Sequence, residues 1–86
     1  MKFGIYAIRD VYTGFLSPTV EVNDLVAKRN FEHACNRSDS LLFSHAQDYD
    51  LYKIVEFESD SGVVTPLTPI EFIANGKSVL GGSVDA

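Results

Sequence analysis

The stretch Lys2-Phe3-Gly4-Ile5-Tyr6-Ala7-Ile8-Arg9 decides the fold, because it reads as a β-strand that is apolar on both faces. Its side chains alternate, with Phe3, Ile5 and Ala7 on one face and Tyr6 and Ile8 on the other. A second stretch, Leu51-Tyr52-Lys53-Ile54-Val55-Glu56-Phe57-Glu58, has the same two-sided character. These two strands predict a sheet that needs cover on both sides.

Turn residues flank both strands. After residues 2–9, a turn ending at Gly14 leads into a short strand at residues 15–16, which Pro18 confines to an edge because proline has no N–H to donate. After residues 51–58, the turn Ser59-Asp60-Ser61-Gly62 leads into a returning strand that begins at residues 63–65. We expect Pro66 and Pro69 to limit its pairing, with residues 70–73 adding one short extended segment.

A helix is predicted between the two hairpins. Asn23 is a suitable N-cap, and the helix should end at Asn36 or Arg37. One narrow apolar stripe must lie on the sheet: Ala27, Phe31, Ala34 and Cys35. A further short helical turn is expected at residues 41–43. The predicted fold class is α+β, an antiparallel sheet of about four strands with one packed helix, in the order β-β-α-β-β.

The chain has 86 residues, 45% hydrophobic and 22% charged, which predicts one globular domain. We place this domain at residues 1–73. Residues 74–86 include Asn75-Gly76-Lys77 and Gly81-Gly82-Ser83, so we predict a flexible C-terminal tail. One helix of about four turns covers only one face of the sheet. The other apolar face therefore predicts a homo-oligomer.

Charge and cysteine content limit the ligands and the cellular compartment that we expect for this protein. Seven basic and twelve acidic residues give a net charge of −5, which disfavours nonspecific binding to duplex DNA. The single cysteine, Cys35, cannot form an intramolecular disulfide, as expected of a reducing intracellular compartment. The first apolar run is broken at Arg9 and Asp10, so no membrane span or secretory segment is expected there.

No catalytic or metal-binding constellation is expected. His33 and Cys35 would point about 200° apart on a helix, so at most one of them could face His45, and a fourth zinc ligand is lacking. A thiol on the apolar stripe is also a poor nucleophile. The acidic residues do not follow the order of a calcium-binding loop, and we interpret them as a solvated face: Asp48, Asp50, Glu56, Glu58 and Asp60. Phosphate-binding and nucleophile-elbow motifs are absent from the sequence. We therefore expect neither an enzyme nor a cofactor.

Aromatic and basic residues interleave on the two main strands. Several folds stack single-stranded bases on such a sheet surface. The predicted nucleic-acid site is Lys2, Tyr6, Arg9, Tyr12, Tyr52 and Lys53. The alternative is that Tyr6 and Tyr52 fill the core or an oligomer interface.

Several short motifs occur in a recognisable order. Residues 1–10 are followed by Thr13-Gly14-Phe15, then Asn23-Asp24 with Ala27-x-Arg29-x-Phe31, then Asp48-Tyr49-x-Leu51-Tyr52-x-Ile54 and a turn at Gly62. In this order the sequence resembles the small nonstructural protein of gokushovirus-type microviruses, which are single-stranded DNA bacteriophages.

The resemblance implies a phage accessory protein of the host bacterial cytoplasm, associated with the switch from duplex replication to single-stranded genome synthesis. We accordingly expect a nonenzymatic protein that binds single-stranded DNA as an oligomer. The alternative, which the net charge of −5 favours, is a protein interaction module that engages a host or viral replication protein without nucleic-acid contact.

Overall fold

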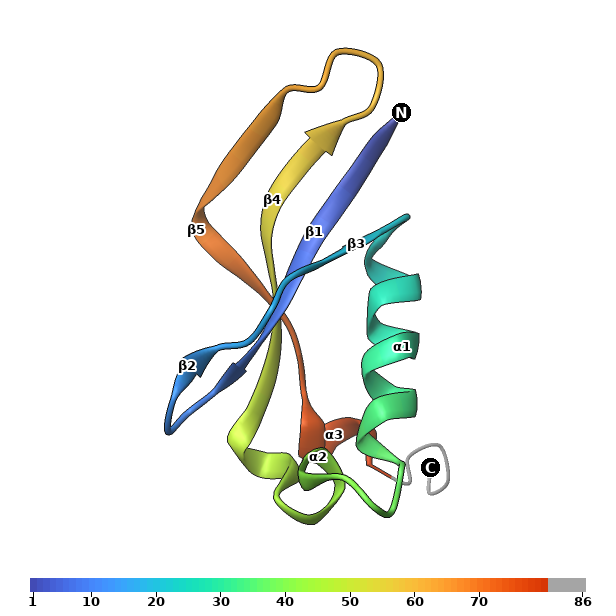
Figure 1. The fold of residues 1–86 in the computed structure, drawn as a ribbon, viewed down its shortest axis with the longest axis vertical. Coiled ribbons are helices and arrows are strands. Elements are labelled where there is room, and N and C mark those ends of the chain that lie inside the picture. Colours follow the sequence, from blue (N-terminus) through green and yellow to red (C-terminus); the bar gives the residue numbers. More distant parts are fainter. Residues whose placement is uncertain (81–86) are drawn as a thin grey trace.

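The protein folds as an antiparallel sheet with one long helix on one side, which confirms the α+β fold class (Figure 1). The computed structural model describes residues 1–80. In chain order the elements are β1 (Lys2–Asp10), β2 (Gly14–Phe15), β3 (Thr19–Glu21), α1 (Asp24–Cys35), α2 (Leu41–Ser44), a 3-10 turn (Ala46–Asp48), β4 (Tyr49–Glu58), β5 (Val64–Asn75) and α3 (Gly76–Val79). The strand order is β2-β1-β4-β5, and β3 also pairs with β1.

The local sequence signals place most of these elements correctly. The side chain of Asn23 accepts a hydrogen bond from the backbone N–H of Val26 at 2.9 Å, which caps α1 as predicted, and Asn36 ends that helix. Gly14 adopts a φ of 102°, a conformation that other residues rarely reach, in the turn between β1 and β2. The short strand β3, after Pro18, is an element that the sequence did not indicate.

The edge strand β5 differs from its prediction. It runs from Val64 to Asn75 as one strand, although its register against β4 breaks. Pro66 lies opposite Val55 and Glu71 lies opposite Lys53, so residues 67–70 of β5 face a single residue of β4 and form a bulge. Both prolines are tolerated because β5 has a neighbour on one side only.

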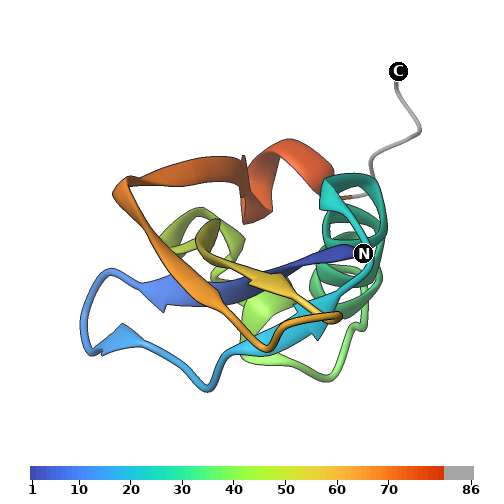
Figure 2. The same cartoon turned by 90° about the horizontal axis from the view of Figure 1, so that it is seen from above.

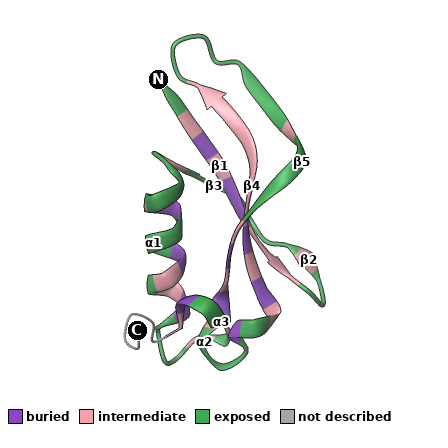
Figure 3. Cartoon of the chain, turned by 180° about the vertical axis from the view of Figure 1, so that it is seen from behind, coloured by how far each residue is buried: buried purple, intermediate pink, exposed green. Residues whose placement is uncertain are grey.

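The core lies between α1 and the sheet (Figure 3). Three residues of the predicted helix stripe, Ala27, Phe31 and Cys35, are buried there, and Ala34 is half-buried. The predicted start of the tail is wrong: Ala74 and Val79 are 4% and 5% exposed and belong to this core. The glycine and lysine at positions 76 and 77 form a short helix instead of a loose segment, because strand β5 carries the chain back to the core. Positions 81–86 of the predicted tail lie outside the described residues.

The two sides of the sheet are covered unequally. Figures 1 and 2 show α1 along one side of the sheet, with α2 and α3 at one end. Within residues 1–80, no helix lies over the opposite side of β1 and β4 (Figure 2). None of the helices in this part of the chain is long and apolar enough to span a membrane.

Candidate nucleic-acid interface on the open face of the sheet

Cross-strand register decides which side chains share a face. Tyr6 pairs with Lys53 and Ile8 with Leu51, on the side that α1 covers. Between them, Ala7 pairs with Tyr52, on the opposite side. We call that uncovered side the open face, and its residues in this region include Ala7, Arg9, Phe15, Asp50, Tyr52 and Phe72, continued toward the other end by Phe3 and Phe57.

Three aromatic rings form a continuous row across the open face. The ring centroids of Phe15 and Tyr52 are 5.7 Å apart, and those of Tyr52 and Phe72 are 5.8 Å apart, both with edge-to-face geometry. The small side chain of Ala7 lets rings from β2 and β4 meet across β1. Phe15 is 47% exposed and Phe72 57% exposed, so the row has ring surface available for a ligand.

Arg9 is the basic residue of this face. It pairs in register with Phe15 and Asp50, which places it beside the aromatic row. Neither a hydrogen bond nor an ion pair of its guanidinium occurs among residues 1–80. A guanidinium beside aromatic rings is suited to bind a phosphate or carboxylate group. Arg9 and Tyr52 are thus two predicted site residues that the fold brings together.

Tyr6 is not available to a ligand. Its side chain is 1% exposed, and its hydroxyl donates a short hydrogen bond to Asp24 at the start of α1. Burial, followed by that hydrogen bond, raises the pKa of Tyr6 well above its ordinary value. Gly4 is required beside it, because a Cβ at position 4 would collide with the Tyr6 ring. The alternative prediction, that this tyrosine fills the core, is correct.

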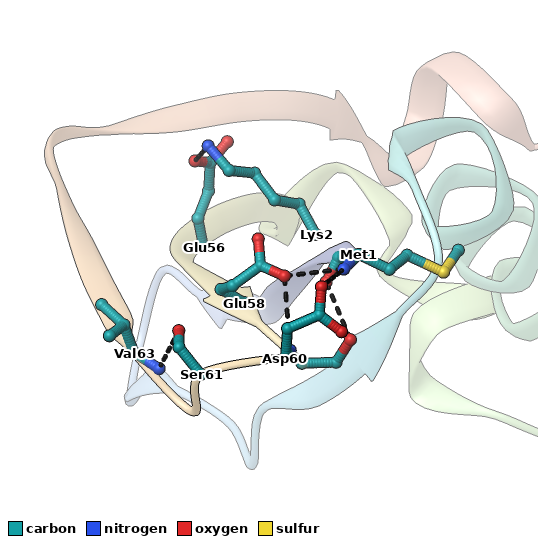
Figure 4. Close-up of polar contacts among 8 residues, drawn as sticks. Met1, Lys2, Glu56, Glu58, Asp60, Ser61 and Val63 are labelled. Carbon is teal, nitrogen blue, oxygen red and sulfur yellow. Dashed lines mark hydrogen bonds and ion pairs between the residues drawn. The ribbon is translucent and has the colours of Figure 1, made fainter.

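The two predicted lysines lie on the helix side and are already paired. Lys53 is 15% exposed, and its Nζ atom lies 3.3 Å from Oε2 of Glu56 and 3.8 Å from Oδ1 of Asp24. The Nζ atom of Lys2 lies 3.8 Å from the other oxygen of Glu56 (Figure 4). Because both side chains lie on the helix side, neither lysine adds to the charge of the open face.

Tyr12, the remaining predicted residue, is 81% exposed in the turn between β1 and β2. It makes no ring contact with the aromatic row among the described aromatic pairs. Phe15 and Phe72 were not among the predicted site residues. Their signal was present as apolar residues on two edge strands, but only the register shows that they flank Tyr52.

The acidic residues near the β4–β5 turn form ion pairs with the ammonium group of Met1. The Met1 ammonium group lies 2.6 Å from Oε2 of Glu58 and 3.3 Å from Oδ2 of Asp60 (Figure 4). The hydrogen bond from that ammonium group holds the pKa of Glu58 below its usual value. The backbone N–H of Ser59 also donates to the Met1 carbonyl oxygen at 2.9 Å. These carboxylates therefore have a structural role at one end of the sheet.

The candidate metal ligands do not come together. Cys35 is fully buried, whereas His33 and His45 are exposed. Burial raises the pKa of the Cys35 thiol to about 11, which suppresses its reactivity. Across residues 1–80, no group of three or more His, Cys, Asp or Glu side chains is arranged to hold a metal ion.

The fold and the open face define a small α+β protein with a partly exposed aromatic sheet surface. A family model described as Phage ORF5 protein matches residues 3–79, and the chain belongs to this family. It is therefore a bacteriophage protein. The match also extends through Val79, in agreement with the packing of α3 against the core. No curated protein and no solved structure matches the sequence.

Proposed function

We propose that this phage protein is a nonenzymatic, nonstructural protein of viral DNA replication that binds single-stranded DNA on its open face, as an oligomer. The resemblance to the gokushovirus-type protein supports the viral class and a place of action in the host bacterial cytoplasm. The observation that carries the proposal is the row Phe15–Tyr52–Phe72 beside the unpaired Arg9.

Stacking supplies most of the affinity in this proposal. Every base has a π-face, and stacking on an aromatic side chain contributes about 1–3 kcal/mol per base. The exposed surfaces of Phe15 and Phe72 can each receive a base. Arg9 can contact a phosphate of the same strand.

The net charge sets the character of the binding. With Lys2 and Lys53 on the helix side, Arg9 is the basic strand residue that the open face offers to phosphate. Because the slope of log K against log salt is about −0.7 for each phosphate contact to a single strand, we expect a slope near −1. Basic single-strand binding proteins show a much steeper slope.

Fluorescence anisotropy with a labelled single-stranded oligonucleotide, measured across a salt series, tests the proposal. Phe72→Ala should weaken binding by about fivefold or more, because one stacking platform is lost. Leu25→Ala is the matched control, since Leu25 is 78% exposed on α1, away from the open face. If the protein does not bind even at low salt, where phosphate attraction is strongest, the proposal fails.

The oligomeric part of the proposal is tested separately. At the other end of the open face, the rings of Phe3 and Phe57 are 6.5 Å apart and half-buried, so a second copy could cover this end and leave the aromatic row free. Light scattering at micromolar concentration should give a mass above that of one chain. A monomeric mass contradicts self-association without affecting DNA binding.

A second candidate function is protein binding through the open face without nucleic acid. The net charge of −5 favours it, because the whole molecule repels phosphate. Arg9→Gln distinguishes the two functions: it should weaken DNA binding about threefold or more, whereas an apolar protein partner that covers the rings should be little affected.

A further inference from the structure

A cavity lies on the helix side of the sheet, away from the open face. It has a volume of about 170 Å³ and is bounded by α1 on one side and by β1 and β3 on the other. Figure 1 shows β3 leading across the sheet to the upper end of α1. The inner wall is mostly apolar and is formed by Tyr6, Ala7, Ile8, Ala27, Phe31, Ala34 and Leu51. A space of this size is large enough for a benzene-sized group.

The rim of the cavity is polar and carries one charge. Ser17, Thr19, Glu21 and Asn30 contribute to the lining, and no basic residue does. Glu21 accepts a hydrogen bond from Nδ2 of Asn30 at 3.1 Å and one from the Thr19 hydroxyl at 3.3 Å, one on each carboxylate oxygen. A carboxylate has about four acceptor positions, so Glu21 can still bind a cationic donor. Its two present partners hold it in place at the rim.

From this arrangement we propose that the cavity binds a basic segment of a partner protein, which inserts one apolar side chain next to a lysine or arginine. The apolar wall accepts the inserted side chain, and Glu21 pairs with the neighbouring cation. The net charge of −5 attracts the same kind of partner over a longer range. An acidic or nucleic-acid ligand would place like charge against Glu21, so it does not fit.

This site is independent of the proposed DNA surface. Its lining comes from α1, β1, β3 and β4 and includes Ala7 of the open face, but Phe15, Tyr52 and Phe72 do not line it. A protein with both surfaces could hold a DNA strand on one side and a basic protein segment on the other.

Amide chemical shifts of the full chain, followed by NMR during titration with three short capped peptides, test the proposal. The probes are Lys-Phe-Lys, Glu-Phe-Glu and Lys-Ala-Lys. Lys-Phe-Lys should shift the amides of residues 27–34 and bind about tenfold more tightly than Lys-Ala-Lys, which lacks the apolar group. Glu-Phe-Glu should bind at least about fivefold more weakly than Lys-Phe-Lys, because it meets Glu21 with the wrong charge.

Two variants check the position of the site. Ala34→Leu fills the cavity and should remove the shifts caused by Lys-Phe-Lys. Glu21→Gln keeps the size of the side chain and should reduce the preference for Lys-Phe-Lys over Glu-Phe-Glu by about threefold or more, leaving the weaker preference that the overall negative charge supplies. Glu32→Gln, on α1 and outside the cavity lining, is the control and should keep the preference.

The proposal is overturned if Lys-Ala-Lys binds as well as Lys-Phe-Lys, because the attraction is then general electrostatics. Equal binding of Lys-Phe-Lys and Glu-Phe-Glu to the wild type also overturns it. Should Ala34→Leu fail to fold, Glu21→Gln decides: an unchanged preference for the basic peptide in that variant contradicts the assigned site.

Discussion

The two faces of the sheet contain comparable apolar side chains, but they have different roles. On the covered face, Leu51 and Tyr6 are 4% and 1% exposed and pack under α1. On the open face, Phe15 and Phe72 remain about half exposed although they also contact neighbouring rings. The covered face is a core and the open face is an available surface.

This difference shows that apolar composition does not by itself distinguish a core from a binding surface. β1 and β4 supply large side chains in both directions, and the position of α1 decides which of them are removed from water (Figure 3). The comparison predicts that substitutions on the covered face act on stability, whereas substitutions on the open face act on binding.

The largest expected effect comes from removing a ring on the covered face. Phe31→Ala should lower the free energy of unfolding by about 3–5 kcal/mol, because it leaves a cavity beneath α1. Phe72→Ala on the open face should cost less than about 1 kcal/mol, since that ring is 57% exposed. Urea unfolding followed by circular dichroism measures both. Equal losses would mean that the open face is covered in solution.

The second-largest effect is expected for Gly76→Ala, which tests whether α3 packs against the rest of the fold. A Cβ at Gly76 would collide with the backbone carbonyl oxygen of Ala46, which cannot move aside as a side chain can. Gly76→Ala should therefore lower the free energy of unfolding by roughly 1–3 kcal/mol. Lys77→Ala, next to it and exposed, is the control. If Gly76→Ala is neutral, then α3 does not pack as described.

A third prediction uses pH to probe burial on the covered face. The pKa of Cys35 rises from 9.0 to about 11 in the folded protein. Because the pKa is higher in the folded state than in the unfolded state, the neutral thiol contributes to stability. This contribution is fully present below pH 9 and is lost as the pH rises to about 11. Between pH 8 and pH 11 the free energy of unfolding should fall in both proteins. The fall should be larger in the wild type than in Cys35→Ala, by up to about 2 kcal/mol. Identical pH dependence in the two proteins would contradict the burial of the thiol.

The smallest effect concerns the hydrogen bond that fixes α1 on the covered face. Tyr6→Phe keeps the ring but removes the donor to Asp24. We expect a loss of about 1 kcal/mol, because Asp24 remains partly exposed near the ammonium group of Lys53. Thermal unfolding measures the change. A loss above about 3 kcal/mol would contradict this expectation and would show that α1 shifts when the hydrogen bond is removed.

Much of the fold was predictable, because its signals are local. Alternation identified β1 and β4, Asn23 identified the start of α1, and the turn residues identified both hairpins. The boundary after residue 73 was wrong because glycine and a short polar run are typical of loose tails, while the burial of Val79 depends on contacts with distant elements.

The candidate site was predicted less well, for a related reason. Tyr6 and Lys53 were assigned to the same surface as Tyr52, but register places both of them on the helix side. Residue type indicated aromatic and basic character, whereas direction depends on pairing. Phe15 and Phe72 could be recognised only after their strands were placed beside β1 and β4.

The sequence by itself determined the two central strands, both hairpins and the long helix, and it showed more apolar side chains than that helix can cover, because these features follow from periodicity and length along the chain. Only the tertiary structure decided which side of the sheet α1 covers, and therefore which aromatic residues are core and which form a surface. That choice depends on cross-strand register and on one helix packing against one of two similar faces, and neither is encoded by neighbouring residues alone.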